Sequence, residues 1–376
     1  MLKIRNNFIK KKIFKYINEK KILQLSQYNK KLQNLLNITI KDYKIFAQTE
    51  IELIPDIFSK KRNIFINITN ENIPYIHIYA NDNYDKEFKS YKLRIKNNIS
   101  KIKIIIDNEI KSFKGLFKNC ECLKEVNIIK CNRKDIINMS QMFYGCKNII
   151  KLNLLNLKTD KVKDMSYLFS ECSSLINIDL SNFNTSNVNN MQNMFEQCSN
   201  VAQLNLNNFN TSNVIYMNNM FSECSALNSL NIDNFDTSNV INMSYMFSNC
   251  SYLGELKLTN FDTIKVKDMS YMFYKCSHLE KLNLSNFNAS NVINMSNMFN
   301  KCFDLIKLDI SKFDIKDITN IKYMFSNCQL ELQYKIKNQF KNINYSAFEE
   351  DEEDNKIDIV ENYSYKSNLS GGFISL

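Results

Sequence analysis

The sequence predicts an α/β solenoid, a stack of nine 26-residue coils that each contribute one short parallel strand and one short helix. Two observations support this prediction: phenylalanine and cysteine both recur at a strict interval of 26 residues, and every interval has the same order of apolar positions. A fixed period between about 20 and 50 residues is typical of solenoids and propellers. The cysteines of the series are Cys120, Cys146, Cys172, Cys198, Cys224, Cys250, Cys276, Cys302 and Cys328.

The stretch 188–209 illustrates how one coil is expected to fold. In its first half the apolar residues are spaced by three, three, one and three positions, which predicts the inward face of a short helix. These residues are Val188, Met191, Met194, Phe195 and Cys198. In its second half the alternation Leu204-Asn205-Leu206 predicts a short strand with both leucines inward. The intervening Asn and Ser residues are expected at the corners and on the outer surface.

The cysteine column is expected to consist of free thiols packed as small hydrophobic side chains. The N-terminal sequence has no apolar segment of the kind that a signal peptide needs, and no run approaches 18 apolar residues. We therefore expect a cytoplasmic protein, where thiols stay reduced. Disulfides between neighbouring coils remain an alternative, whereas a column of ligands does not suit a zinc site.

The repeated pattern also indicates a family. The sequence C-x-x-L-x-x-L-x-L, followed by S-N-F-[ND]-T-S-N-V-x-N-M-x-x-M-F, resembles the BspA-like leucine-rich repeats of bacterial surface proteins and unicellular eukaryotes. The resemblance runs from about Met139 to Cys328, with a degenerate copy from Phe113 to Cys131. It implies a leucine-rich-repeat solenoid with parallel strands on one face and helices or turns on the other. It also implies a surface adhesin as an alternative function, at the cell surface.

The exposed positions of the predicted strands form the candidate binding face. This column consists of Asn153, Asp179, Asn205, Asn231, Lys257, Asn283 and Asp309. Because binding hot spots favour Trp, Tyr and Arg, an alternative interpretation is that these short polar groups mainly satisfy neighbouring coils. The predicted helix side offers another set of contacts, which consists of Tyr167, Tyr216, Tyr245, Tyr271 and Tyr323.

The first 40 residues form a basic segment, with ten Lys or Arg against one acid. Its apolar residues follow a helical pattern, and the stretch IFKYINEKKILQLSQYNKKLQ resembles the F-box. That resemblance implies docking on the Skp-type subunit of a cullin ubiquitin ligase. The residues expected to dock are Ile9, Ile13, Phe14, Ile17, Ile22 and Leu25. A helical start packed on the next segment and an amphipathic helix on a membrane surface are the alternatives.

The remaining segments are assigned from their composition. Residues 41–112 are expected to form a β-rich cap with strands near 63–69, 75–79 and 102–106, followed by the solenoid over 113–330. Residues 331–345 are expected to form a C-terminal cap helix, and 346–376 a disordered acidic tail. The basic head and the acidic tail are either solvated or contact nucleic acid, a membrane or each other.

The sequence lacks the residues that catalysis or cofactor binding would need. It has only two histidines, His77 and His278, neither beside a candidate nucleophile, and its five glycines form no phosphate-binding loop. We therefore predict a protein without enzymatic activity, cofactor or metal. The predicted function is a leucine-rich-repeat scaffold for a protein ligand, with an F-box-type substrate adaptor and a surface adhesin as alternatives, and nucleic acid is not the expected ligand.

Overall fold

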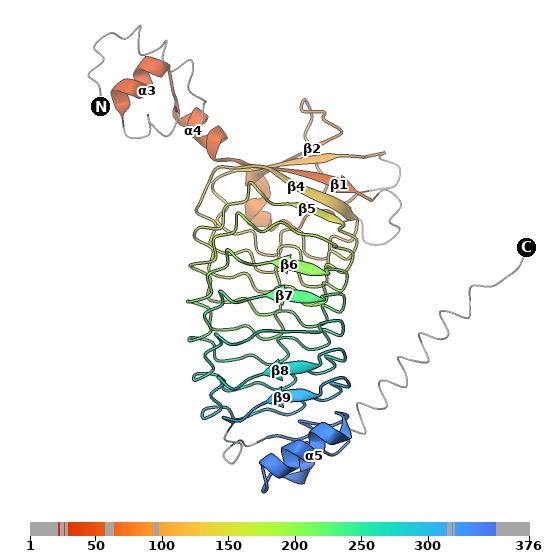
Figure 1. The fold of residues 1–376 in the computed structure, drawn as a ribbon. Helices are drawn as coiled ribbons and strands as arrows, with labels where there is room; N and C mark the ends of the chain where they lie inside the picture. The colour runs from red at the N-terminus through yellow and green to blue at the C-terminus, as the bar shows by residue number, and fades with distance from the viewer. Residues whose placement is uncertain are drawn as a thin grey trace, which may run out of the picture.

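The computed structural model describes residues 29–56, 64–93, 98–313 and 320–350, together with Ile22, Ser26 and Ile318. These residues form an elongated stack with a five-stranded sheet at one end and helix α5 at the other (Figure 1). The helices are α3 (Lys30–Leu36), α4 (Ile40–Ala47), η1 (Asn70–Tyr75), α5 (Leu330–Gln339) and η3 (Tyr345–Ala347). The strands are β1 (Thr49–Pro55), β2 (Ile76–Ala80), β3 (Ile102–Ile106), β4 (Leu123–Cys131), β5 (Lys151–Asn153), β6 (Gln203–Asn205), β7 (Ser229–Asn231), β8 (Lys281–Asn283) and β9 (Lys307–Asp309).

The N-terminal sheet has the strand order β2-β3-β1-β4-β5 and is joined to the stack through β4. Strand β4 pairs antiparallel with β1 on one side and parallel with β5 on the other, where Val126 lies opposite Leu152. Of the strands expected near this end, the one at 63–69 is wrong. Within its described part, 64–69, only Ile64 forms a bridge, and the amides of Phe65 and Asn67 donate to two different loops, at Tyr91 and Leu116.

Beyond β4, the chain forms an open stack of repeats linked by parallel bridges 26 residues apart. The phenylalanine column stacks through the core with ring centroids 5.6 to 5.8 Å apart, from Phe117 to Phe348. One ladder of bridges runs through Ser112, Asn138, Asp164, Asn190, Tyr216, Asn242, Asp268, Asn294 and Asn320. Equivalent side chains therefore lie in files along the axis of the stack.

The cysteine column is buried, and all eleven cysteines of the chain are free thiols. Each thiol of the column from Cys146 onward donates to a phenylalanine carbonyl of the preceding coil, as Cys198 Sγ does to the carbonyl oxygen of Phe169 at 3.2 Å. Burial raises the pKa of the Cys198 thiol to about 12. The disulfide alternative is therefore not realised in this structure.

The segment before each strand departs from the sequence prediction. Residues 188–198 contain no helix, and the predicted helix in each coil is wrong throughout the described part of the stack. Two consecutive turns take its place. In the first, the amide of Met194 donates a hydrogen bond to the carbonyl of Met191, and in the second, the amide of Cys198 donates to the carbonyl of Phe195. The third residue of each turn, Asn193 or Gln197, has a positive φ of 56° or 55°, as a type II turn requires.

Turns replace the helix because they direct alternate amides to the next coil. In an α-helix, every interior amide donates to a carbonyl of its own segment. Here the amide of Asn193 donates to the carbonyl of Asn218, and that of Phe195 to the carbonyl of Met220, both at 3.0 Å. Apolar residues that lie three positions apart fit such turns as well as they fit a helix. The apolar pattern alone therefore suggested the wrong element.

Asparagine and threonine side chains provide further bonds between coils. The amide group of Asn208 donates to the carbonyls of Leu180 and Phe183, at 3.0 and 2.7 Å, and Thr211 Oγ1 donates to the carbonyl of Asp236 at 2.8 Å. The column of equivalent asparagines with such bonds consists of Asn156, Asn182, Asn208, Asn234, Asn260 and Asn286. Many asparagine side chains of the repeat thus form hydrogen bonds that link one coil to the next.

The last coil is covered by α5 and by the segment that follows it. The amides of Tyr323 and Phe325 donate to the carbonyls of Ser346 and Ala347, where a further coil would otherwise pair, and Phe348 extends the phenylalanine stack. Within the segment 331–345, expected to be one cap helix, α5 ends at Gln339. Residues 351–376 of the predicted acidic tail lie outside the described residues.

Candidate binding surface

The predicted binding face is an exposed column along the strands. Six of its members are exposed, and Asp309 is half-buried. Apart from Lys257, each member accepts a hydrogen bond from the amide two residues further on, as Asn205 Oδ1 does from Asn207 at 3.2 Å. These side chains cap their own turns, whereas the bonds between coils come from the separate column that contains Asn208.

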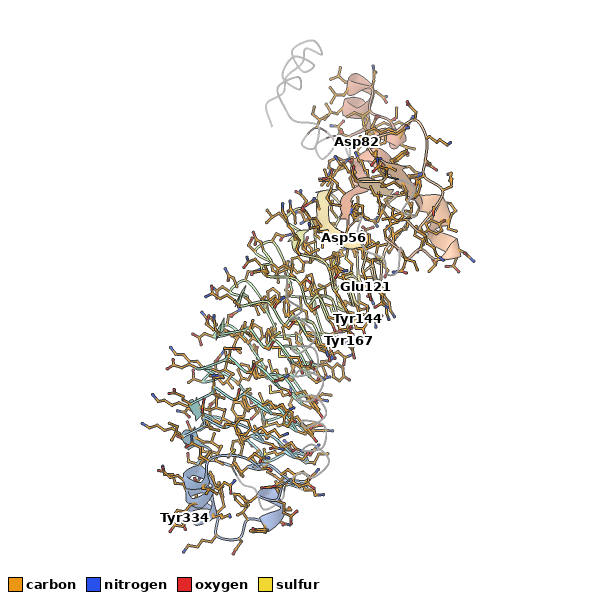
Figure 2. All side chains as sticks on the ribbon, turned by 90° about the vertical axis from the view of Figure 1, so that its right-hand side faces the viewer. Asp56, Asp82, Glu121, Tyr144, Tyr167 and Tyr334 are labelled. Atoms are coloured by element: carbon orange, nitrogen blue, oxygen red, sulfur yellow. The ribbon has the colours of Figure 1, made fainter. Side chains whose placement is uncertain are left out.

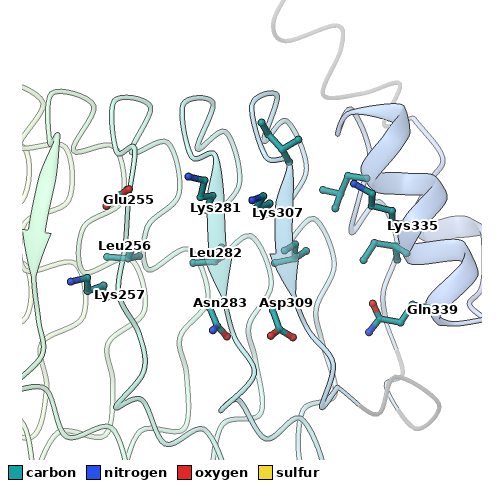
Figure 3. Close-up of a pocket in the computed structure, with 14 residues that line it drawn as sticks. Glu255, Leu256, Lys257, Lys281, Leu282, Asn283, Lys307, Asp309, Lys335 and Gln339 are labelled. Atoms are coloured by element: carbon teal, nitrogen blue, oxygen red, sulfur yellow. The ribbon is translucent and has the colours of Figure 1, made fainter.

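At the C-terminal end of this face, the stack and α5 enclose a groove of about 530 Å³ (Figure 3). It includes Lys257, Asn283 and Asp309 of the predicted column. The other four members, Asn153, Asp179, Asn205 and Asn231, do not line it. The structure thus divides the predicted face into a part that lines the groove and a part that lies along the earlier coils.

The groove has an apolar floor. Leu256 and Leu282 are buried beneath it on the strand side, Leu308 is partly buried, and Leu332 and Ile336 are buried on the side of α5. These residues lie between the polar and charged groups of the groove rim. A concave surface with an apolar floor and a few polar groups is the usual form of a ligand site.

The rim of the groove carries more positive than negative charge. Its basic residues are Lys257, Lys281, Lys307 and Lys335, and its acids are Glu255 and Asp309. Lys335 forms an ion pair with Glu331 at 2.6 Å, whereas the other three lysines form no ion pair with any described residue. Hydrogen bonds from Ser311 lower the pKa of Asp309, which therefore stays ionised.

Sequence reasoning missed three of these lysines and the contribution of α5. Lys281 and Lys307 directly precede the inward leucines of β8 and β9, so they belong to the exposed column adjacent to the predicted one. Their side-by-side register was readable from the period of 26 residues. Lys335 was not, because it lies beyond the point where the repeat ends.

The tyrosines expected on a helix side lie instead in the turns. Tyr167, Tyr245, Tyr271 and Tyr323 are half-buried at positive φ, and only Tyr216 is exposed. Tyr245 and Tyr271 stack with ring centroids 4.4 Å apart. Tyr144 and Tyr167 lie on one edge of the stack (Figure 2), with their rings edge to face. These rings pack on one another along the edge of the coils.

The two histidines lie in separate settings. His77, on β2, is held between Glu87 and Asp107, at 2.7 and 3.4 Å. His278 is exposed, donates a hydrogen bond from Nδ1 to the carbonyl of Ser251 at 2.6 Å, and stacks on Tyr252. Among the described residues, no three His, Cys, Asp or Glu side chains group as metal ligands.

Most of the predicted adaptor-docking residues cannot be placed. Ile9, Ile13, Phe14, Ile17 and Leu25 lie outside the described residues. Ile22 is described and half-buried, and its carbonyl accepts a hydrogen bond from Ser26 Oγ at 2.9 Å. No described helix is both long and apolar enough to cross a bilayer.

The comparisons with known proteins concern the stack. The family model described as "Mycoplasma protein of unknown function, DUF285" matches residues 111–229, 176–257 and 253–356, which together cover more than half of the chain. The chain belongs to this DUF285 family. Family membership confirms the prediction of a repeat family and does not extend to residues 1–40.

The other comparisons add little. No curated protein matches the chain. Among solved structures, a leucine rich cell surface protein from Faecalibacterium prausnitzii A2-165 is 17% identical, over 51% of this chain and 74% of that chain, with a TM-score of 0.21.

Proposed function

We propose that this protein is a non-catalytic, cytoplasmic scaffold of nine coils that binds a protein ligand through its leucine-rich-repeat surface. The groove between the last strands and α5 carries the proposal, because it combines an apolar floor with three lysines that form no ion pair with a described residue. Residues of both kinds are needed for a specific site, since burial of apolar side chains supplies affinity and the charges select the partner.

The groove fits a ligand better than the rest of the strand face does. Along the earlier coils, short polar side chains such as Asn205 and Asn231 already accept hydrogen bonds from their own turns. A partner would have to compete with these bonds. Exposed isoleucines recur at one position of the earlier coils, as at Ile176, but Ile306 lines a groove whose other side is formed by Leu332 and Ile336 of α5.

The settings of the titratable groups support a non-catalytic role. His77 is engaged by two carboxylates, and His278 is stacked on a tyrosine. The thiols of the nine-residue cysteine column are buried, and burial raises the pKa of each, so they are poor nucleophiles at neutral pH. Free thiols in this number also suit a reducing compartment, which supports the cytoplasm.

The test compares two matched variants of the full chain. Ile306→Asp places a charge on the groove, and Ile176→Asp makes the same change at the equivalent position five coils earlier, where the isoleucine is 55% exposed. Both variants and the native chain are used for quantitative affinity purification from the source cells. If Ile306 is a hot spot, its loss costs about 2 kcal/mol, which corresponds to about a thirtyfold loss of affinity.

We expect a set of proteins that the native chain and Ile176→Asp retain equally and that Ile306→Asp loses. Equal retention by all three chains would refute the proposed binding surface. Recovery of a Skp-type subunit would favour the F-box adaptor instead, and cleavage of the protein by protease added to intact cells would favour the adhesin.

A further inference from the structure

We infer that the acidic segment 349–361 of this same chain occupies the groove. The inference rests on the groove proposed above as a binding surface and names the chemistry that fits it. The segment reads EEDEEDNKIDIVE and carries eight acids against one lysine. It thus complements a rim on which four lysines outnumber two acids.

The lysines on the strand side are placed as if for an anionic partner. Lys281 lies between Glu255 and Lys307 in the parallel register, and its pairing with Lys307 on β8 and β9 places two like charges side by side. Like charges directly opposite one another destabilise a sheet. On the other side of the groove, Lys335 projects from α5 (Figure 3), and among the described residues it forms an ion pair only with the largely exposed Glu331. An acidic segment between these elements would neutralise both sides.

The apolar residues of the segment match the floor of the groove. After its run of six acids and the pair Asn355-Lys356, the segment continues Ile357-Asp358-Ile359-Val360. In an extended chain, alternate side chains point to opposite faces. Ile357 and Ile359 can therefore face the leucine floor while Asp358 faces away from it. A purely acidic tail would have had no such complement to Leu282 and Leu308.

The segment also begins close enough to reach the groove. Phe348 stacks on Phe325, and Lys337 of α5 lies 4.4 Å from the centre of the Phe348 ring. The chain therefore leaves the described region beside α5, which forms one wall of the groove. The eleven residues that follow Glu350, up to Glu361, span about 36 Å when extended. That length exceeds the spacing of several coils at about 4.8 Å each.

Attachment to the same chain makes such docking effective even when the contact is weak. A short flexible linker gives an effective concentration of about 1 mM. If the isolated segment bound with a Kd of about 0.1 mM, about nine tails in ten would be docked. The tail would then act as an internal competitor that an external ligand must displace.

A single tryptophan provides the test, because the sequence contains none. Ile359→Trp in the full chain reports on the segment, and Asn368→Trp serves as a matched reporter beyond it. The groove is changed in a double variant, Lys281→Glu with Lys307→Glu, called the groove pair. The control for charge, called the control pair, is Lys161→Glu with Lys163→Glu, which changes two exposed lysines of an earlier coil. Emission wavelength and quenching by neutral acrylamide are measured at low salt.

We expect the tryptophan at 359 to emit at shorter wavelength and to be protected from acrylamide in the native groove and in the control pair. The groove pair should abolish both effects, and the tryptophan at 368 should be exposed throughout. Because the changed lysines are exposed, thermal melting should remain close to that of the native chain.

Three results would overturn the inference: an exposed tryptophan at 359 in every chain, protection that survives the groove pair, and protection that disappears on dilution. The second would mean docking elsewhere, such as on the basic head, and the third would mean docking on another molecule. Loss of partner proteins with Ile306→Asp is measured separately. The proposed function can therefore stand where this inference falls.

Discussion

Substitution of Asn208 tests whether the asparagines of the repeat hold the coils together. Asn208→Ala removes two hydrogen bonds from one side-chain amide, to the carbonyls of Leu180 and Phe183, at 3.0 and 2.7 Å. A hydrogen bond of this kind contributes about 0.5 to 1.5 kcal/mol net. We therefore expect the free energy of unfolding to fall by about 1 to 3 kcal/mol.

The matched control is Asn205→Ala, three residues earlier in the same coil. Asn205 is exposed and accepts one hydrogen bond, from the amide of Asn207 at 3.2 Å, so its loss should cost less than about 1 kcal/mol. With a shift of about 2 to 4 °C per kcal/mol, thermal melting followed by circular dichroism should separate the two variants.

Repeat arrays do not always unfold in one step. Hydrogen exchange at residues 180–183 therefore provides a local measure beside the melting temperature, and it should accelerate only in Asn208→Ala. Equal melting shifts together with equal exchange in the two variants would show that the bonds between coils contribute no more than an exposed turn cap, and the reasoning would fail.

Three further predictions concern the turns, the thiols and the N-terminal sheet. Gly145→Ala should lower the free energy of unfolding by more than about 1 kcal/mol, because φ is +69° and the added Cβ would collide with Asn119 Oδ1; an unchanged urea midpoint would contradict this. The cysteine thiols, such as Cys198 with its pKa raised to about 12, should resist alkylation at pH 8 until urea unfolds the stack, and rapid labelling of the native protein would refute their burial. Burial lowers the pKa of His77, but hydrogen bonds and charge from Glu87 and Asp107 outweigh burial and raise the pKa above 6.5. The stabilisation by protonated His77 is therefore complete below pH 6.5 and is lost as pH rises through the folded pKa. His77→Gln should remove this pH-dependent loss of stability, and a pH profile of the melting temperature identical to that of the native chain would argue against it.

The core of the stack could be predicted from the sequence because its period is exact. A residue such as Phe195 or Cys198 recurs every 26 positions, and only a stack places every copy inside. The local structure of the coil was less accessible. Left-handed turn positions favour Asn and Gly, but these columns also hold Tyr245 and Lys275, which hide that preference.

The candidate site was only partly predictable for a different reason. Alternation within a strand shows that Asn283 and Asp309 face outward, and the structure places them there. It does not show that a helix closes one side of the strand face. The failure of the repeat at Glu331 indicates where the stack ends, whereas the position of α5 depends on Leu332 and Ile336, which pack against the core.

The end of the stack is where a regular array can acquire a specific site. Equivalent coils present equivalent side chains, and in this chain those side chains mostly satisfy their own turns or the next coil. A ligand on such a face would meet the same short polar groups at each step, so neither its register nor its identity would be fixed. Helix α5 breaks this equivalence, because it adds a wall that no coil provides and encloses Lys281 and Lys307 in a groove with an apolar floor. Selectivity should therefore depend on α5 and the last two strands, while the earlier coils set the length and rigidity of the support.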